Sequence, residues 1–242
     1  DTFFSLLYSG DPLQAPEFKL EPVKAKLGDL IMDAHGDLAV LAAGTQVRPS
    51  GCTTPDCEVA WDGTTELTLG QLVLTYTVAD NARWSDGVPI TAQDMLLSYH
   101  LVSDPATAGS KQIFEFTQKV ATQEDKAFQW FGLPGFTRVD PKLVDWKPMP
   151  SHQLQSFSPE QLKEETIATS HPLGWGPYQW SESQEEGVYN FVPNGNAIDA
   201  SAPWTQFDQV QVRIVEDRDT ALTELANGSC DVLDASYPFD AS

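Results

Sequence analysis

The side chains that most often carry out catalysis or bind metals are spread thinly along this chain. Adjacent carboxylates occur at Glu164–Glu165 and Glu185–Glu186, where solvated helix or turn surfaces explain them without acid–base chemistry. The chain has no nucleophile elbow, zinc-protease motif or phosphate-binding glycine loop. The histidines are scattered: His35, His100, His152 and His171. We therefore predict no catalytic residue, no cofactor and no metal site.

The cysteines offer the clearest covalent chemistry. Cys52 and Cys57 bracket a Thr-Thr-Pro-Asp loop, and a disulfide across so short a turn is geometrically possible. The alternative is a pair of free thiols, because the spacing fits neither a zinc knuckle nor a redox pair. A disulfide would suit an oxidising, extracytoplasmic setting. Cys230, followed by Val232 and Leu233, is predicted to be a buried structural thiol.

Composition and charge narrow the class of protein. A length of 242 residues with 41% hydrophobic content allows one large domain or two small ones. The 35 acidic and 14 basic residues give a formal charge of −21, which repels nucleic acids and anionic membrane surfaces. The acidity could favour cationic ligands or serve solubility alone. No apolar run could span a membrane, and we expect any targeting segment to lie outside this sequence, which starts abruptly at Asp1.

One stretch near residue 80 organises the surrounding elements. Alternating apolar residues from Leu72 to Val78 predict a half-buried strand, and Ser85-Asp86-Gly87 predicts a tight turn. Thr91 and Asp94 have the spacing of a capping box, so a helix should begin there and end near Asp104.

Later segments show the same kinds of capping and alternation. Ser158-Pro159-Glu160-Gln161 predicts the start of a helix that runs to about Thr169. Strands are expected from Tyr178 and over Val188 to Val192 and Val210 to Ile214. A helix capped by Asp217 or Asp219 should then bury four residues, stop at Gly228 and lead into a strand at Asp231 to Asp234. Those four residues are Ala221, Leu222, Leu225 and Ala226.

Three of these segments together resemble the family 5 extracellular solute-binding proteins, the peptide- and nickel-binding receptors of ABC importers. The passage from His171 to Tyr178 is similar to the family's second landmark, with Trp175 in place of the usual Thr. The strand, helix and Gly228-x-x-Asp231 run is similar to the third. The first landmark, a strand followed by Ala-Lys-Trp-Ser-Asp-Gly-Thr-Pro-Val-Thr-Ala-x-Asp, is matched at Ala82, Arg83, Trp84, Ser85, Asp86, Gly87, Pro89, Thr91, Ala92 and Asp94.

The resemblance implies a fold and a domain arrangement. The expected fold class is α/β and periplasmic-binding-protein-like (class II, cluster C type), with a mixed-sheet lobe and a smaller α+β subdomain. Residues 1–37 would form the first part of lobe I, residues 38–155 the small subdomain, and residues 156–242 the return to lobe I. Family members continue for a comparable length, so we expect the second large lobe to be absent from this sequence.

The resemblance also implies candidate ligand contacts. The first ten residues correspond to the floor of the family's binding cleft, where the backbone can pair with an extended ligand; Ser5, Leu7 and Tyr8 are candidates there. The alternative is that the first ten residues form a buried strand or a short helix of the core. Phe114 and Phe116 could lean over a ligand or pack in the core. Trp175 could be packed under a lobe or displayed in the cleft.

The implied function is that of the extracytoplasmic substrate-binding component of an ABC importer. It would be a monomer, lipid-anchored through a segment absent here, that delivers an oligopeptide or another small solute to permease subunits in the membrane. The seven Trp also allow an oligosaccharide ligand, and nickel is less favoured because no His or Cys cluster is visible. The alternative from another class is an adhesion or signalling sensor module that reuses the fold.

Overall fold

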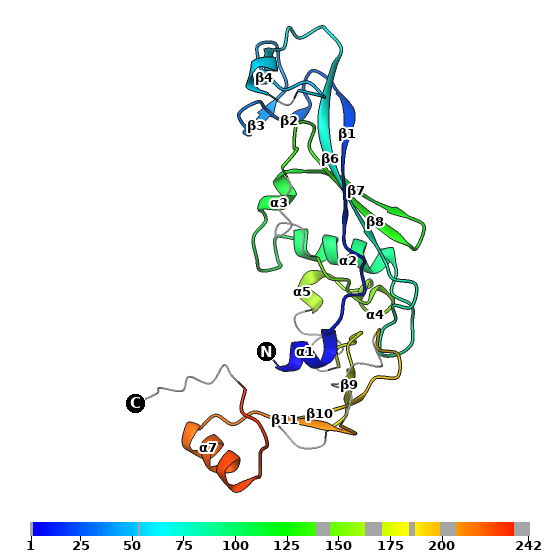
Figure 1. Ribbon diagram of the computed structural model, residues 1–242, viewed down its shortest axis with the longest axis vertical. Coiled ribbons are helices and arrows are strands. Elements are labelled where there is room, and N and C mark those ends of the chain that lie inside the picture. Colours follow the sequence, from blue (N-terminus) through cyan, green and yellow to red (C-terminus); the bar gives the residue numbers. More distant parts are fainter. Residues whose placement is uncertain are drawn as a thin grey trace. The chain divides into compact units, whose positions relative to one another are not determined.

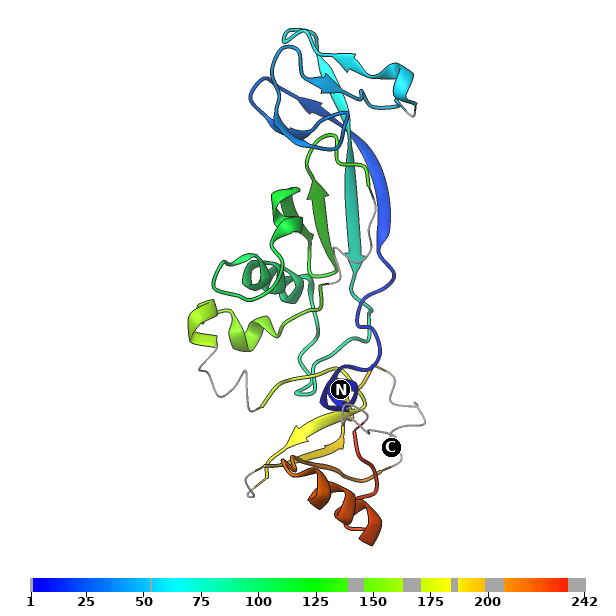
Figure 2. The same cartoon turned by 90° about the vertical axis from the view of Figure 1, so that its left-hand side faces the viewer.

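A computed structural model describes residues 2–52, 54–138, 146–162, 171–183, 187–198 and 207–234 (Figures 1 and 2). The chain divides into two compact units, which are described separately. Unit 1 consists of Asp1–Pro12, Asp80–Pro89 and Thr166–Ser242, and unit 2 of Leu13–Ala79 and Ile90–Glu165. Among the described residues, no helix has the length and apolar character needed to cross a membrane.

Unit 2 is built on a four-stranded antiparallel sheet with the order β1-β6-β8-β7. The strands are β1 (Glu17–Ala25), β6 (Leu67–Thr77), β7 (Thr117–Gln123) and β8 (Ala127–Gly132). The strand predicted from Leu72 is confirmed as the second half of β6. Its apolar side chains are buried because β6 lies inside the sheet, with β1 alongside it in Figure 1.

Helix α2 (Ala92–Ser103) packs against β7 and β8 on one side of this sheet (Figure 2). The predicted capping box is confirmed: the Thr91 hydroxyl accepts a hydrogen bond from Gln93 N, and Asp94 Oδ2 accepts one from Thr91 N at 2.7 Å. The second carboxylate oxygen, Oδ1, accepts a hydrogen bond from Ser151 N at 2.7 Å. The buried Asp94 thus joins α2 to the first residue of helix α4 (Ser151–Leu154).

Two small hairpins and a 3-10 turn complete one end of unit 2. They are β2 (Leu30–Met32) with β3 (Leu38–Val40), β4 (Gln46–Val47) with β5 (Val59–Ala60), and η1 (Pro55–Cys57). Their core contains Ile31, Leu41, Val47, Trp61 and Leu69. Cys52 and Cys57 are joined by a disulfide, with Cα atoms 5.7 Å apart. The bond closes the loop between β4 and β5.

Unit 1 contains a three-stranded antiparallel sheet with the order β11-β10-β9. The strands are β9 (Tyr178–Ser181), β10 (Val188–Pro193) and β11 (Val210–Arg213), as the alternating patterns predicted. Helix α1 (Thr2–Tyr8) packs against β9, and its Leu7 joins Tyr178 and Phe191 in the core. Helix α7 (Arg218–Asn227) begins at the Asp217 cap and ends at Gly228, whose φ of 78° is left-handed.

Three expectations for the C-terminal part of unit 1 are wrong. On α7 only Ala221 is buried; Leu225 is 38% exposed and Ala226 is also exposed. Residues 231–234 form no strand, and the Cys230 thiol is only partly buried. Helical spacing predicted the apolar stripe correctly but not whether another element of the described chain covers it.

The two units differ in their boundaries from the lobes expected at residues 37/38 and 155/156. Residues 17–25 belong with unit 2 because β1 pairs with β6 along its whole length, from Glu17 with Thr75 to Ala25 with Leu67. How the units correspond to the lobes of a receptor stays a prediction. All strand pairs in the described ranges are antiparallel. The helix predicted from Ser158 appears as α5 (Pro159–Leu162); its later residues, both carboxylate pairs and residues 235–242 lie outside the described residues.

Candidate ligand-binding site

The C-terminal end of α1 lies directly on the Gly174-Trp175-Gly176 turn of unit 1. Gly176 N donates a hydrogen bond to Leu7 O at 2.7 Å. A Cβ atom on Gly174 would lie 2.1 Å from Leu7 O, and one on Gly176 would lie 2.6 Å from Leu7 C. Any other residue at these two positions would therefore push α1 off the turn, since the atoms it meets belong to the backbone.

Trp175 is packed inside unit 1 and not displayed on its surface. Its side chain is 2% exposed, and its indole Nε1 donates to Gly10 O at 3.1 Å. The ring meets the edge of Tyr8, with centroids 4.9 Å apart, and that of the fully buried Trp84, with centroids 5.6 Å apart. Of the two roles left open for Trp175, the geometry favours packing, since the ring is buried against Tyr8 and Trp84.

Three asparagines hold the turn and the signature stretch together within unit 1. Asn194 Nδ2 donates to Gly176 O at 2.9 Å, and Asn196 Nδ2 donates to Ser85 O at 3.1 Å. Asn81 Nδ2 donates to Ile198 O at 3.2 Å. The sequence pattern assigned no role to these side chains. Two of these pairings span more than one hundred residues and the third spans 18, so none leaves a local signal in the sequence.

The candidate residues on helix α1 differ in how far their side chains are exposed. Leu7 is buried, whereas Ser5 is exposed and Tyr8 is partly buried. Burial raises the pKa of the Tyr8 hydroxyl above its usual value. Phe4 is 53% exposed, with its ring centroid 5.1 Å from that of Tyr8, one helical turn away. Sequence reasoning placed Phe4 among apolar core residues and missed it as a surface group.

Backbone pairing between this segment and an extended ligand stays a prediction, and the conformation of residues 2–8 does not favour it. Residues 2–8 are helical, so their amide and carbonyl groups follow the helical hydrogen-bonding pattern and present no strand edge. A ligand at α1 would meet side chains and the helix ends. Apolar composition alone could not distinguish a short helix from a strand here.

Phe114 and Phe116 belong to unit 2 and have separate surroundings there. The Phe114 ring, on helix α3 (Gln112–Glu115), stacks on Trp146 with centroids 6.0 Å apart and meets Tyr99 edge-on at 5.4 Å. Phe116 stacks on Phe136 at 5.6 Å. Both side chains are partly buried. These contacts are those of aromatic packing, and leave only part of each ring for a ligand.

The structure thus brings Leu7, Tyr8 and Trp175 together, with Ser5 nearby on the same helix. Phe114 and Phe116 belong to unit 2 and are described apart from that group. Within the described ranges, no three His, Cys, Asp or Glu side chains gather as a metal site would require. The arrangement suits non-covalent binding by an aromatic surface on a firmly held helix.

This architecture has the fold of solved oligopeptide-binding proteins. It superimposes with a TM-score of 0.54 on the oligopeptide-binding protein AppA of Bacillus subtilis, solved in complex with a nonapeptide, at 17% identity over 92% of this chain and 40% of that one. The periplasmic oligopeptide-binding protein of Thermotoga maritima with bound mannohexaose superimposes with a TM-score of 0.53, at 17% identity over 93% of this chain and 35% of that one. The expected periplasmic-binding-protein-like fold is therefore confirmed, whereas the sheets in the described ranges are antiparallel and not mixed.

The chain belongs to the bacterial extracellular solute-binding proteins, family 5: the model of the middle region of that family matches residues 63–242. The periplasmic murein peptide-binding protein MppA of Escherichia coli is 49% identical over 105 residues, which are 43% of this chain and 16% of MppA. A Brucella ovis protein named provisionally as an ABC transporter peptide-binding protein is 24% identical over 165 residues. The matched part spans 67% of this chain and 30% of that relative, so the relatives are much longer.

Proposed function

We propose that the chain forms part of the extracytoplasmic substrate-binding component of an ABC importer for oligopeptides. The observation that carries this proposal is membership of a solute-binding family, with a murein peptide-binding protein 49% identical over 105 residues among its relatives. Receptors of this kind close around the solute by a hinge movement and pass it to permease subunits. The protein acts as a monomer and binds without catalysis.

The family and the disulfide support an extracytoplasmic location. Cys52 and Cys57 form a bond that persists in oxidising compartments and is rare in the cytosol. Anchoring by a lipid at the N-terminal side would keep such a receptor close to its permease. Metabolic labelling of the protein in its host with a radioactive fatty acid tests the anchor independently of ligand binding.

Six side chains are proposed to contribute to solute binding. Ser5 and Tyr8 would contact the solute directly, since both reach the surface of α1. Leu7 and Trp175 would hold Tyr8 in place from below. Phe114 and Phe116 would contribute the exposed parts of their rings from unit 2.

A second candidate is an oligosaccharide receptor of the same family. Two observations favour it: a structural neighbour is named as a peptide-binding protein yet was solved with mannohexaose, and α1 carries partly exposed aromatic rings of the kind that stack on sugars. Both candidates use the same aromatic surface.

Thermal-shift measurements distinguish the candidates. The purified protein is heated with di- to pentapeptides, cello-oligosaccharides or Ni²⁺, because a ligand that binds only the folded state raises the melting temperature. Stabilisation by peptides supports the first candidate and stabilisation by sugars the second. If no compound shifts the melting temperature, the proposed transport role is wrong.

A further inference from the structure

Phe4 and Tyr8 form an aromatic surface on α1, and the proposed function leaves open which peptides that surface prefers. They are four residues apart and therefore share one side of the helix. Phe4 is among the more exposed large apolar side chains of the described chain, and its ring is held against Tyr8. A Phe presented in this way has apolar area available for a partner.

The support beneath these rings is continuous. Tyr8 rests against Trp175, and Trp175 rests against Trp84, which is fully buried. The hydrogen bonds from Trp175 Nε1 to Gly10 O and from Gly176 N to Leu7 O hold the middle ring of this series and the end of α1 in place. The aromatic surface of α1 therefore needs little ordering when a ligand binds, which lowers the entropic cost of binding.

The charge of unit 1 indicates which ligand this surface suits. Unit 1 contains 16 of the 35 acidic residues but only 3 of the 14 basic ones, a formal balance of 3 − 16 = −13, whereas unit 2 carries 11 − 19 = −8. Two of the three arginines already have partners: Arg83 Nη1 donates to Gly87 O at 3.0 Å, and Arg213 Nη2 lies 2.8 Å from Glu224 Oε2. Such a field attracts cations over several ångströms.

We infer that Phe4 and Tyr8 bind a cationic side chain of a peptide, the ammonium of lysine or the guanidinium of arginine, and so make this a receptor that prefers positively charged peptides. The inference rests on the proposed peptide-binding function and adds a substrate class to it. Aromatic faces attract cations through the ring quadrupole, and the acidic unit raises the local concentration of the same ligands. Anionic peptides are disfavoured by the same field.

Three peptides of equal length test the preference. Calorimetric titration compares Ala-Lys-Ala with Ala-norleucine-Ala, which keeps the aliphatic chain but lacks the ammonium, and with Ala-Glu-Ala. The lysine peptide should bind most tightly and the glutamate peptide most weakly, with the differences shrinking as salt rises. N-acetylated Ala-Lys-Ala should keep its advantage over N-acetylated Ala-norleucine-Ala, because the bound cation is on the side chain; loss of that advantage would contradict the inference. Equal affinities for the three peptides would overturn the inference and leave the peptide-binding function standing, whereas no binding by any peptide would remove both.

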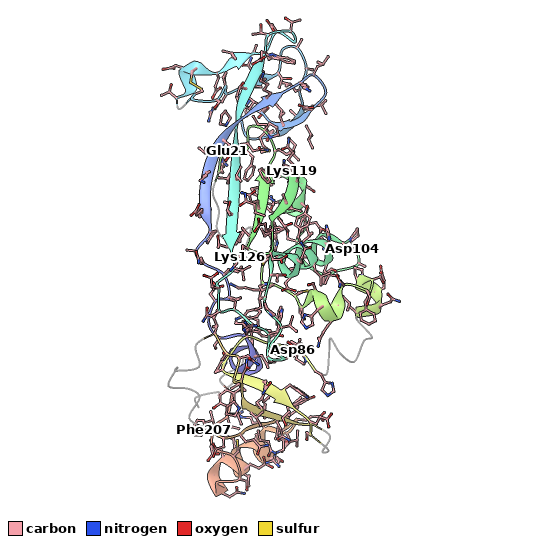
Figure 3. The ribbon with its side chains drawn as sticks, turned by 90° about the vertical axis from the view of Figure 1, so that its right-hand side faces the viewer. Glu21, Asp86, Asp104, Lys119, Lys126 and Phe207 are labelled. Atoms are coloured by element: carbon pink, nitrogen blue, oxygen red, sulfur yellow. A yellow bond between two sulfur atoms is a disulfide. The ribbon has the colours of Figure 1, made fainter. Side chains whose placement is uncertain are left out.

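A pair of matched variants ties the preference to α1. Phe4→Leu keeps an apolar side chain but removes the ring, so the affinity for Ala-Lys-Ala should fall about two- to fivefold while that for Ala-norleucine-Ala changes little. Phe207→Leu makes the same change at a side chain of unit 1 that is 65% exposed, on the loop before β11 (labelled in Figure 3). It should alter neither affinity. A cation site on α1 would be contradicted if Phe4→Leu lowered the affinity for both peptides equally. It would also be contradicted if Phe207→Leu lowered the affinity for Ala-Lys-Ala as much as Phe4→Leu does.

Discussion

The contact between α1 and the Gly174-Trp175-Gly176 turn makes a quantitative prediction for Gly176→Ala. The added Cβ would lie 2.6 Å from Leu7 C, which is 0.8 Å short of the 3.4 Å of an ordinary contact. Because the obstructing atom belongs to the backbone, α1 must shift. Relieving such overpacking costs about 1–3 kcal/mol, and losing the Gly176 N to Leu7 O hydrogen bond costs about 1 kcal/mol more. The free energy of unfolding should fall by about 2–4 kcal/mol.

Gly195→Ala is the matched control within the same unit. No heavy atom lies within 4 Å of a Cβ built there, and Gly195 is not in the left-handed region. The substitution should therefore leave the free energy of unfolding unchanged or raise it by up to about 1 kcal/mol. Any increase would come from the smaller conformational freedom of alanine in the unfolded chain. Urea unfolding followed by tryptophan fluorescence and far-UV circular dichroism measures both variants. Equal midpoints for the two variants would refute the role assigned to the glycine turn.

Three further predictions concern unit 2. Replacing Cys52 and Cys57 by serine should lower the free energy of unfolding by about 2 kcal/mol, the chain-entropy value for a loop this short, and reduction of the native protein should give the same shift in a urea titration. Asp94→Ala removes the carboxylate that accepts hydrogen bonds from Thr91 N and Ser151 N, and leaves both amides without that partner. The free energy of unfolding should fall by about 2–4 kcal/mol in the same assay. A fall of less than about 1 kcal/mol would contradict the role of Asp94 in joining α2 to α4. Hydrogen bonds from the side chain and backbone of Thr65 hold the pKa of Asp62 far below its usual value. The ionised Asp62 carboxylate therefore stabilises the folded state fully above about pH 4, and this contribution is lost as the pH falls towards the folded-state pKa. In Asp62→Asn, the urea concentration at the unfolding midpoint should decrease less steeply with falling pH than in the original protein.

Local spacing in the sequence predicted helix ends well. The Thr91–Asp94 capping box and the Gly228 stop are present. At the start of α5, Ser158 N donates to Gln161 Oε1 at 2.8 Å, and the Ser158 hydroxyl accepts from Gln161 N at 3.3 Å. Each of these features joins residues at most three or four positions apart. The side chains therefore find the same partners whatever the rest of the fold does.

The candidate site depended on contacts that local spacing cannot contain. The burial of Trp175 follows from its hydrogen bond to Gly10, 165 residues away, and the position of Ser85 from Asn196, 111 residues away. The apolar spacing of α7 was correct, yet Leu225 is exposed, because burial depends on whether another element packs there. Family resemblance supplied the order of the landmarks, but the helical state of residues 2–8 had to come from the structure.

The central claim, that this protein captures peptides, is tested most directly by calorimetric titration with tri- to pentapeptides. We predict saturable binding of one peptide per protein, with a negative heat-capacity change from the burial of aromatic surface on α1. Saturable binding of mannose or glucose oligosaccharides alongside no detectable heat from any peptide would contradict it.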